Sequence, residues 1–209
     1  MTAASRTISA LRREAAECRR CPLWENATQT VFGEGGIGGI MLVGEQPGDV
    51  EDRAGHPFVG PEGRLLRELL AEAGIREEGV YVTNAVKHFK WRPSGKRRIH
   101  DNPNWSEIDA CSHWLGLELE AVRPALVVCL GATAAGALFG RSARVGKLRG
   151  RRLELDRGLP ALVTIHPSAV LRADDQLEAR RAELLSDLEL ARDVLEELGP
   201  RQRSKTAKS

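Results

Sequence analysis

The chain has 209 residues, of which 42% are hydrophobic, so it can form the core of one folded domain and wholesale disorder is excluded. Its 31 Lys and Arg residues against 29 Asp and Glu leave a formal net charge of +2, which excludes a histone-like polycation. No apolar run reaches the ~18–20 residues of a membrane span, and the N-terminus lacks a signal-peptide core. We therefore expect a cytoplasmic protein without membrane contact, and the absence of a coiled-coil pattern predicts a monomer.

Apolar strands alternate with amphipathic helices along the chain. Ser5 is the expected cap of a first helix, and helical spacing predicts further helices at residues 64–73, 105–122 and 177–198. Continuous apolar runs predict strands at residues 40–44, 80–83, 126–130 and 162–165, as in a parallel sheet covered on both faces. The sequence thus predicts an α/β fold, a three-layer α/β/α sandwich with a central, mainly parallel four-stranded sheet. Residues 1–199 are expected to form this single domain, and residues 200–209 a flexible C-terminal tail.

Two long stretches without periodicity follow the first two strands, at residues 45–63 and 87–104. Ligands bind beyond the carboxyl ends of parallel strands, so we expect the functional site there. The first stretch crowds acidic residues into one loop, namely Glu45, Asp49, Glu51 and Asp52. The second is rich in basic residues between positions 90 and 100, namely Lys90, Arg92, Lys96, Arg97 and Arg98, which either neutralise phosphates or form a solvated surface. Pro93 and Gly95 favour an irregular loop, in which Trp91 either stacks on a base or anchors the chain.

All four cysteines fit one pattern, Cys18-x2-Cys21 followed by Cys111-x17-Cys129. In a cytoplasmic chain this favours metal or cluster ligation over disulfides, and all four side chains are expected to point inward. Four thiolates suit either Zn or a [4Fe–4S] cluster, and the spacing does not choose between them. Either group would be structural, because four protein ligands leave no coordination position open. Four ordinary buried cysteines are the alternative.

Several motifs then resemble those of family-4-type uracil-DNA glycosylases. They are Gly44-Glu45-Gln46-Pro47-Gly48, Pro57-Phe58-Val59-Gly60, Thr83-Asn84-Ala85-Val86-Lys87 and His166-Pro167-Ser168. The four cysteines resemble the [4Fe–4S] ligands of that family, so the similarity runs in order from Cys18 to Ser168. Gln46 stands where Ala is usual, and a basic insert ends in His100. Both features are typical of the UdgX branch, whose members become covalently attached to uracil-containing DNA.

The resemblance implies roles for residues that bind the substrate. Uracil-containing DNA, single-stranded or with the nucleotide extruded from a duplex, would be the partner. Phe58 would stack on the base and Asn84 would read its edge, although a core Phe and a turn-capping Asn are the structural alternatives. Glu51 would exclude thymine, and Gly44, Gln46 and Asp49 would complete the pocket. DNA contacts would come from Lys96, Arg97, Arg98 and Ser168, of which Ser168 is also a candidate helix cap.

The resemblance also implies the catalytic residues. His166 would stabilise the departing uracil anion. Loss of uracil leaves a sugar with oxocarbenium character, and a neutral imidazole nitrogen can capture its C1′ before water does. By resemblance His100 is this nucleophile, whereas a phosphate or backbone contact is the alternative. Glu45 would fix the imidazole tautomer, stabilise the sugar cation or orient water, and the sequence does not separate these roles. A hydrolytic glycosylase and a non-catalytic iron–sulfur nucleic-acid binder are the rival functions.

Overall fold

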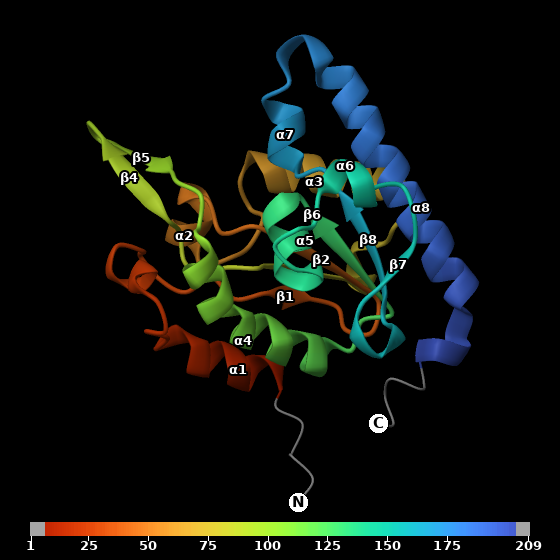
Figure 1. The fold of residues 1–209 in the computed structure, drawn as a ribbon, viewed down its shortest axis with the longest axis horizontal. Coiled ribbons are helices and arrows are strands. Elements are labelled where there is room, and N and C mark those ends of the chain that lie inside the picture. Colours follow the sequence, from red (N-terminus) through yellow and green to blue (C-terminus); the bar gives the residue numbers. More distant parts are fainter. Residues whose placement is uncertain (1–6, 204–209) are drawn as a thin grey trace, which may run out of the picture.

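The computed structural model of the chain describes residues 7–203, with the backbone alone for residues 200–203. Its central sheet has the order β1 (Glu34–Gly35), β3 (Val80–Asn84), β2 (Ile40–Gly44), β6 (Leu126–Leu130), β8 (Pro160–Thr164) and β7 (Leu153–Glu154) (Figure 1). The four inner strands are parallel, whereas β1 and β7 pair antiparallel at the two edges. The mainly parallel sheet is confirmed, but the predicted number of four strands is wrong. The edge strands have two residues each, too few to show a pattern in the sequence.

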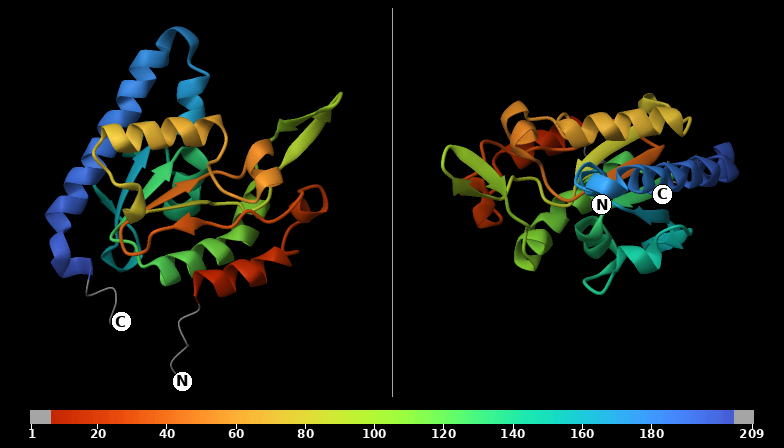
Figure 2. Two further views of the ribbon diagram at one scale, coloured as in Figure 1. Left: turned by 180° about the vertical axis from the view of Figure 1, so that it is seen from behind. Right: turned by 90° about the horizontal axis from the view of Figure 1, so that it is seen from above.

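Helices cover both faces of this sheet (Figures 1 and 2). One face packs against α3 (Pro61–Glu72), α7 (Pro167–Leu171) and α8 (Leu177–Arg203), with side chains such as Leu66 and Leu188 in a shared core. The other face packs against α4 (Trp105–Val122), α5 (Ala132–Phe139) and the short α6 (Val145–Leu148). Helix α1 (Ile8–Ala16) lies on α4. The predicted three-layer α/β/α sandwich is therefore confirmed.

Capping residues explain where the helices begin and end. Helix α4 has the predicted bounds because Asn104 Oδ1 accepts a hydrogen bond from Glu107 N at 3.0 Å, and Glu107 Oε2 accepts one from Asn104 N at 2.7 Å. Thr7 caps α1, while the expected cap, Ser5, lies outside the described residues. Helix α8 breaks at Gly199 (φ 51°) but its backbone continues to Arg203, past the start of the expected tail. The remainder of that tail, residues 204–209, lies outside the described residues.

Both long loops contain regular structure that the sequence did not reveal. The first holds α2 (Asp49–Ala54), whose first turn collects Asp49, Glu51 and Asp52, where the helix dipole favours negative charge. The second forms a β-hairpin of β4 (Trp91–Ser94) and β5 (Arg97–His100). Gly95, with φ 59°, takes the first position of its two-residue turn. The expectation of an irregular loop was wrong, because a proline is tolerated in a strand that has an open edge.

The carboxyl ends of the four parallel strands meet at one edge of the sheet. Glu45, Ala85, Gly131 and Ile165 directly follow these strands. The β4–β5 hairpin projects from the same edge (Figure 1). Among residues 7–203, no helix is both long enough and apolar enough to cross a membrane. The fold thus brings both long loops that follow the first two predicted strands to the carboxyl edge of the sheet.

Candidate functional site

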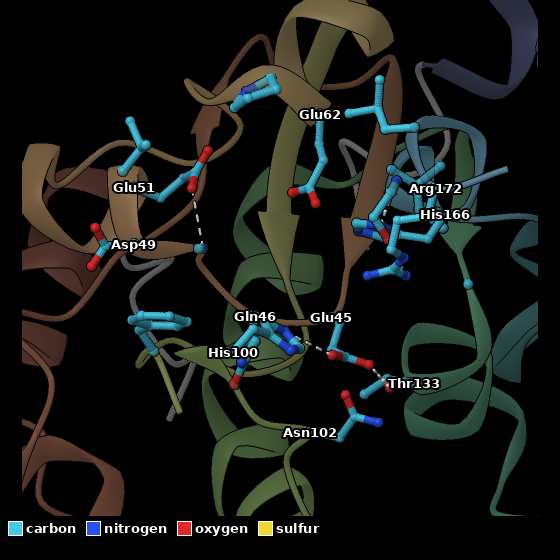
Figure 3. Close-up of a pocket in the computed structure, with 18 of the residues that line it drawn as sticks. Glu45, Gln46, Asp49, Glu51, Glu62, His100, Asn102, Thr133, His166 and Arg172 are labelled. Atoms are coloured by element: carbon cyan, nitrogen blue, oxygen red, sulfur yellow. Dashed lines mark hydrogen bonds and ion pairs between the residues drawn. The ribbon is translucent and has the colours of Figure 1, made fainter. Parts of the chain in front are cut away.

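A cavity of about 540 Å³ opens at the carboxyl edge of the sheet (Figure 3). Eight of the expected site residues line it, namely Glu45, Gln46, Asp49, Glu51, Arg98, His100, His166 and Ser168. Gly44, Phe58 and Asn84 are not among the lining residues but form a contact group of their own. Lys96 and Arg97 are exposed at the hairpin turn. The lining also contains Glu62, Thr133 and Arg172, which the sequence did not point out.

His100 and Glu45 face each other inside this cavity. His100 Nε2 lies 3.2 Å from Glu45 Oε1, and the His100 side chain is 43% exposed. The second oxygen of Glu45 accepts a hydrogen bond from the hydroxyl of Thr133, at the start of α5 (Figure 3). Burial raises the pKa of Glu45, but the hydrogen bonds from His100 and Thr133 outweigh it and hold that pKa below its usual range. Glu45 is thus an ionised acceptor directed at the imidazole.

His166 also lines the cavity, at the N-cap of α7. Its Nδ1 accepts a hydrogen bond from Ser168 N at 3.2 Å, so the neutral ring carries its proton on Nε2. Burial lowers the pKa of His166 to about 4, which keeps the ring neutral at physiological pH. The Ser168 hydroxyl accepts from Arg172 at 2.9 Å and lies 2.9 Å from His166 Nδ1. Ser168 is therefore not the helix cap that the sequence suggested, because His166 takes that position, and Ser168 instead supports His166.

Gly44, Phe58 and Asn84 form one tightly packed group at the ends of β2 and β3. A Cβ on Gly44 would lie 2.4 Å from Asn84 Oδ1 and 2.6 Å from Phe58 Cζ, so this close approach requires glycine. Asn84 Oδ1 is buried and has no hydrogen-bond partner within the described part of the chain. Phe58 adopts a φ of 55°, which is rare for an aromatic residue and is typical of strained functional sites. The group thus places an unpaired, buried acceptor beside an aromatic ring.

Glu51 organises the acidic loop. Its Oε2 accepts a hydrogen bond from Gly48 N at 3.1 Å, and its Oε1 accepts one from Gly60 N at 2.6 Å. Gly48 directly precedes α2 and Gly60 directly precedes α3, so the two carboxylate oxygens bind the backbone at the start of both helices. The side chain still lines the cavity, so it fixes the shape of this wall.

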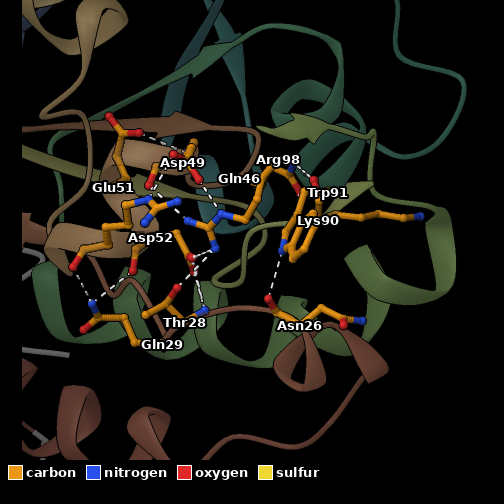
Figure 4. A network of polar contacts seen from close by, with 12 residues as sticks. Asn26, Thr28, Gln29, Gln46, Asp49, Glu51, Asp52, Lys90, Trp91 and Arg98 are labelled. Atoms are coloured by element: carbon orange, nitrogen blue, oxygen red, sulfur yellow. Dashed lines mark hydrogen bonds and ion pairs between the residues drawn. The ribbon is translucent and has the colours of Figure 1, made fainter. Parts of the chain in front are cut away.

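Gln46 joins the loop after β2 to the hairpin (Figure 4). Its side-chain amide donates to the carbonyl oxygens of Lys90 and Asp101, at 3.1 Å each. Its side-chain oxygen accepts from Lys90 N at 3.1 Å. Lys90 and Asp101 are the residues just before β4 and just after β5, so Gln46 ties the two roots of the hairpin together.

Arg98 binds the hairpin to α2 (Figure 4). Its guanidinium forms ion pairs with Asp49 and with the fully buried Asp52, the latter at 2.6 Å, and its side chain is only 13% exposed. This differs from the expected phosphate contact, because the charge of Arg98 is already paired. Trp91 Nε1 donates to Asn26 O at 2.8 Å, so Trp91 anchors the hairpin in this structure. Two residues after Arg98 in the same strand, His100 reaches Glu45.

Three of the four cysteines lie in one group beside α1 and α4. Cys18, Cys21 and Cys111 pack in the same apolar cluster, and the other two cysteines raise the pKa of Cys111 in addition to its burial. Cys111 Sγ accepts a hydrogen bond from Lys87 N at 3.2 Å, and Cys18 Sγ accepts one from Trp114 Nε1 at 3.1 Å. Cys129 is a correction to the predicted set, because it lies within β6 in the core of the central sheet.

His88 is a nearby donor that the sequence did not assign. It lines a small cavity of about 140 Å³ together with Cys18, and it directly follows Lys87, whose amide binds Cys111. In residues 7–203 no three metal-binding side chains are already grouped, so ligation requires side chains to reorient. The donor set nevertheless suits an iron–sulfur cluster, since amide and indole N–H groups already point at two of the sulfurs.

The fold and the cavity together define the class of protein. It is an α/β/α protein whose polar cavity, at the carboxyl edge of a parallel sheet, presents a carboxylate and two histidines. The chain belongs to the uracil DNA glycosylase superfamily, whose profile matches residues 37–189. It is 40% identical over 185 residues to a type-4 uracil-DNA glycosylase of Thermotoga maritima, which covers 88% of this chain and 92% of that protein. A type-4 uracil-DNA glycosylase of Archaeoglobus fulgidus is 38% identical over 167 residues, covering 76% of this chain and 80% of that protein.

Proposed function

We propose that this chain is a uracil-DNA glycosylase that removes uracil from DNA and then remains attached to the abasic sugar through His100. Family membership and the type-4 uracil-DNA glycosylases among its relatives support the first half. The second half is carried by one observation, the pairing of His100 with Glu45 at 3.2 Å inside the cavity. A histidine and a carboxylate in contact are the parts that nucleophilic capture requires.

Base removal begins with extrusion of the uracil nucleotide into the site. The unpaired Oδ1 of Asn84 suits the N3–H of uracil, whereas cytosine presents an acceptor at that position. Phe58 lies beside Asn84 and is buried in this structure, so stacking on uracil requires its ring face to be uncovered. As the C1′–N1 bond breaks, its electron pair leaves with uracil, and the Nε2–H of His166 stabilises the resulting anion. Burial keeps this donor neutral, so it polarises the base without first losing a proton.

Capture follows at the electron-poor C1′. The ring nitrogen of His100 that does not face Glu45 supplies the lone pair of the new C1′–N bond. The proton on Nε2, the nitrogen that faces Glu45, then passes to Glu45 and from there to solvent, while the uracil anion takes up one proton from solvent. The net reaction joins protein to DNA and releases one neutral uracil. Because the new bond has a poor leaving group, the attachment is long-lived.

The proposal is tested by incubation with a uracil-containing oligonucleotide and intact-mass analysis. The expected product has the summed mass of protein and oligonucleotide less one uracil. His100→Ser should abolish this adduct and leave free abasic DNA. His56→Ser is the matched control, since His56 is an exposed histidine that pairs with Glu34. Free abasic DNA from the wild-type chain would instead indicate hydrolytic turnover. Equal binding of uracil-free and uracil-containing strands without base release would indicate a non-catalytic binder.

DNA binding is proposed for the exposed turn of the hairpin. Lys96 and Arg97 are exposed there. Their charges are therefore available to phosphates, while the neighbouring Arg98 is held by Asp49 and Asp52. Alanine at positions 96 and 97 should weaken binding to all sequences alike and reduce its dependence on salt.

A structural [4Fe–4S] cluster is proposed beside α1 and α4. Cys18, Cys21 and Cys111 would hold it, with His88 as the fourth ligand in place of Cys129. With four protein ligands, the cluster would fasten the N-terminal segment to α4 and would take no part in bond breakage. A colourless, zinc-loaded protein would contradict this assignment.

A further inference from the structure

Thr133 lines the cavity but has no role in the proposed steps of base removal and capture. It is half-buried in the first turn of α5, the helix that follows β6. Its hydroxyl does not cap that helix, because Gly131 is the N-cap and no side-chain cap is present. The hydroxyl instead donates to one oxygen of Glu45. Because this hydrogen bond does not stabilise the start of the helix, we looked for its role in the site around Glu45.

The Thr133 hydroxyl and His100 divide the two oxygens of one carboxylate between them. Oε2 of Glu45 binds Thr133, and Oε1 faces His100 Nε2 at 3.2 Å. Rotation about the last bond of Glu45 would exchange or misdirect the two oxygens, and the Thr133 contact opposes that rotation. In the described part of the chain no hydrogen bond joins Thr133 to His100, so any effect on the imidazole passes through Glu45.

We propose that Thr133 is a positioning residue for capture, holding the Glu45 carboxylate so that its free oxygen stays directed at His100. This inference rests on the proposed attachment through His100. With the carboxylate fixed, the His100 proton stays on the nitrogen facing Glu45, and the opposite nitrogen keeps its lone pair for C1′. Without the contact, water competes better for the sugar, so the protein excises uracil but captures the abasic site less often.

The test compares Thr133→Val with Thr133→Ser. Valine has nearly the shape of threonine and a similar preference for helices, so it removes the hydroxyl while keeping the packing. Serine keeps the hydroxyl and serves as the matched control. The measured quantity is the partition ratio, the yield of covalent adduct divided by the yield of free abasic DNA. We expect valine to lower this ratio about tenfold, because a hydrogen bond to a charged group is lost, and serine to restore it.

Two results would overturn the proposal. One is a partition ratio for Thr133→Val equal to that of the wild type, including the case where excision and capture fall together. The other is equal impairment by valine and serine, which would assign the effect to the methyl group.

A second readout needs no DNA, namely ¹⁵N NMR of the His100 ring, assigned with His100→Ser. One fixed tautomer in the wild type and a mixture in Thr133→Val is expected. An unchanged tautomer refutes the positioning role of Thr133 even if the wild-type protein forms no adduct with uracil-containing DNA. A missing adduct alone refutes attachment through His100.

Discussion

The ion pair between the hairpin and α2 makes the sharpest prediction about stability. Arg98 pairs with Asp49 and with Asp52, and the Asp52 side chain is fully buried. Replacing Arg98 with Met leaves the Asp52 carboxylate, among the residues that the structure describes, with only the hydrogen bonds from Thr28 N, at 3.0 and 3.1 Å. Leaving a buried charge unpaired costs about 3–5 kcal/mol, whereas the exposed pair with Asp49 adds less than ~1 kcal/mol. The expected loss in the free energy of unfolding is therefore about 3 kcal/mol.

Urea denaturation followed by circular dichroism measures this loss. Arg97→Met is the matched control, because its side chain is exposed in the same strand, and it should change stability by less than ~0.5 kcal/mol. The double variant Arg98→Met with Asp52→Asn should lose less than the sum of the single losses, since no unpaired charge remains. Arg98→Met should also lower adduct formation, because the strand that carries His100 is released from α2. A loss below ~1 kcal/mol for Arg98→Met would refute the reasoning.

Three further predictions concern the cavity and the cysteines. Burial lowers the pKa of His166 to about 4 from an unfolded value of ~6.5, so the stability linked to its neutral ring is complete above pH ~6.5 and is lost as the pH falls toward 4. His166→Gln should flatten the pH dependence of urea stability in that window, by up to about 3 kcal/mol, and an unchanged curve would contradict this. Cys129→Ala should keep iron and brown colour in the purified protein while Cys111→Ala loses both, and loss of iron in both variants would restore the four-cysteine site. Gln46→Ala should raise amide hydrogen exchange across the hairpin, since both its roots are released, and unchanged exchange would show that Gln46 does not hold them.

The sequence predicts the parallel core of this fold well, and for physical reasons. A strand buried on both faces has to be apolar throughout, so β2 and β6 were found with their observed bounds. Helix α4 was found because its apolar residues recur at helical spacing, and the capping box of Asn104 and Glu107 explains why it begins where it does. The edge strands were missed because a two-residue ladder leaves no period. The hairpin was missed because its proline and glycine are equally typical of irregular loops.

The candidate site was predictable in its location and only partly in its contacts. Glu45 and His166 follow strands whose carboxyl ends share one edge, so their proximity follows from the topology. The partner of a long polar side chain depends on directions that the sequence does not encode. Arg98 therefore looked like a phosphate ligand and proved to be paired with Asp52. Thr133 gave no signal, since a threonine after a strand-to-helix turn is ordinary.

The position of the covalent bond tests the central claim most directly. The wild-type chain is incubated with a uracil-containing oligonucleotide, the adduct is digested with protease and nuclease, and the modified peptide is sequenced by tandem mass spectrometry. The account predicts a deoxyribose remnant on His100. A remnant on any other residue, or complete conversion of the oligonucleotide to free abasic DNA without an adduct, would contradict it.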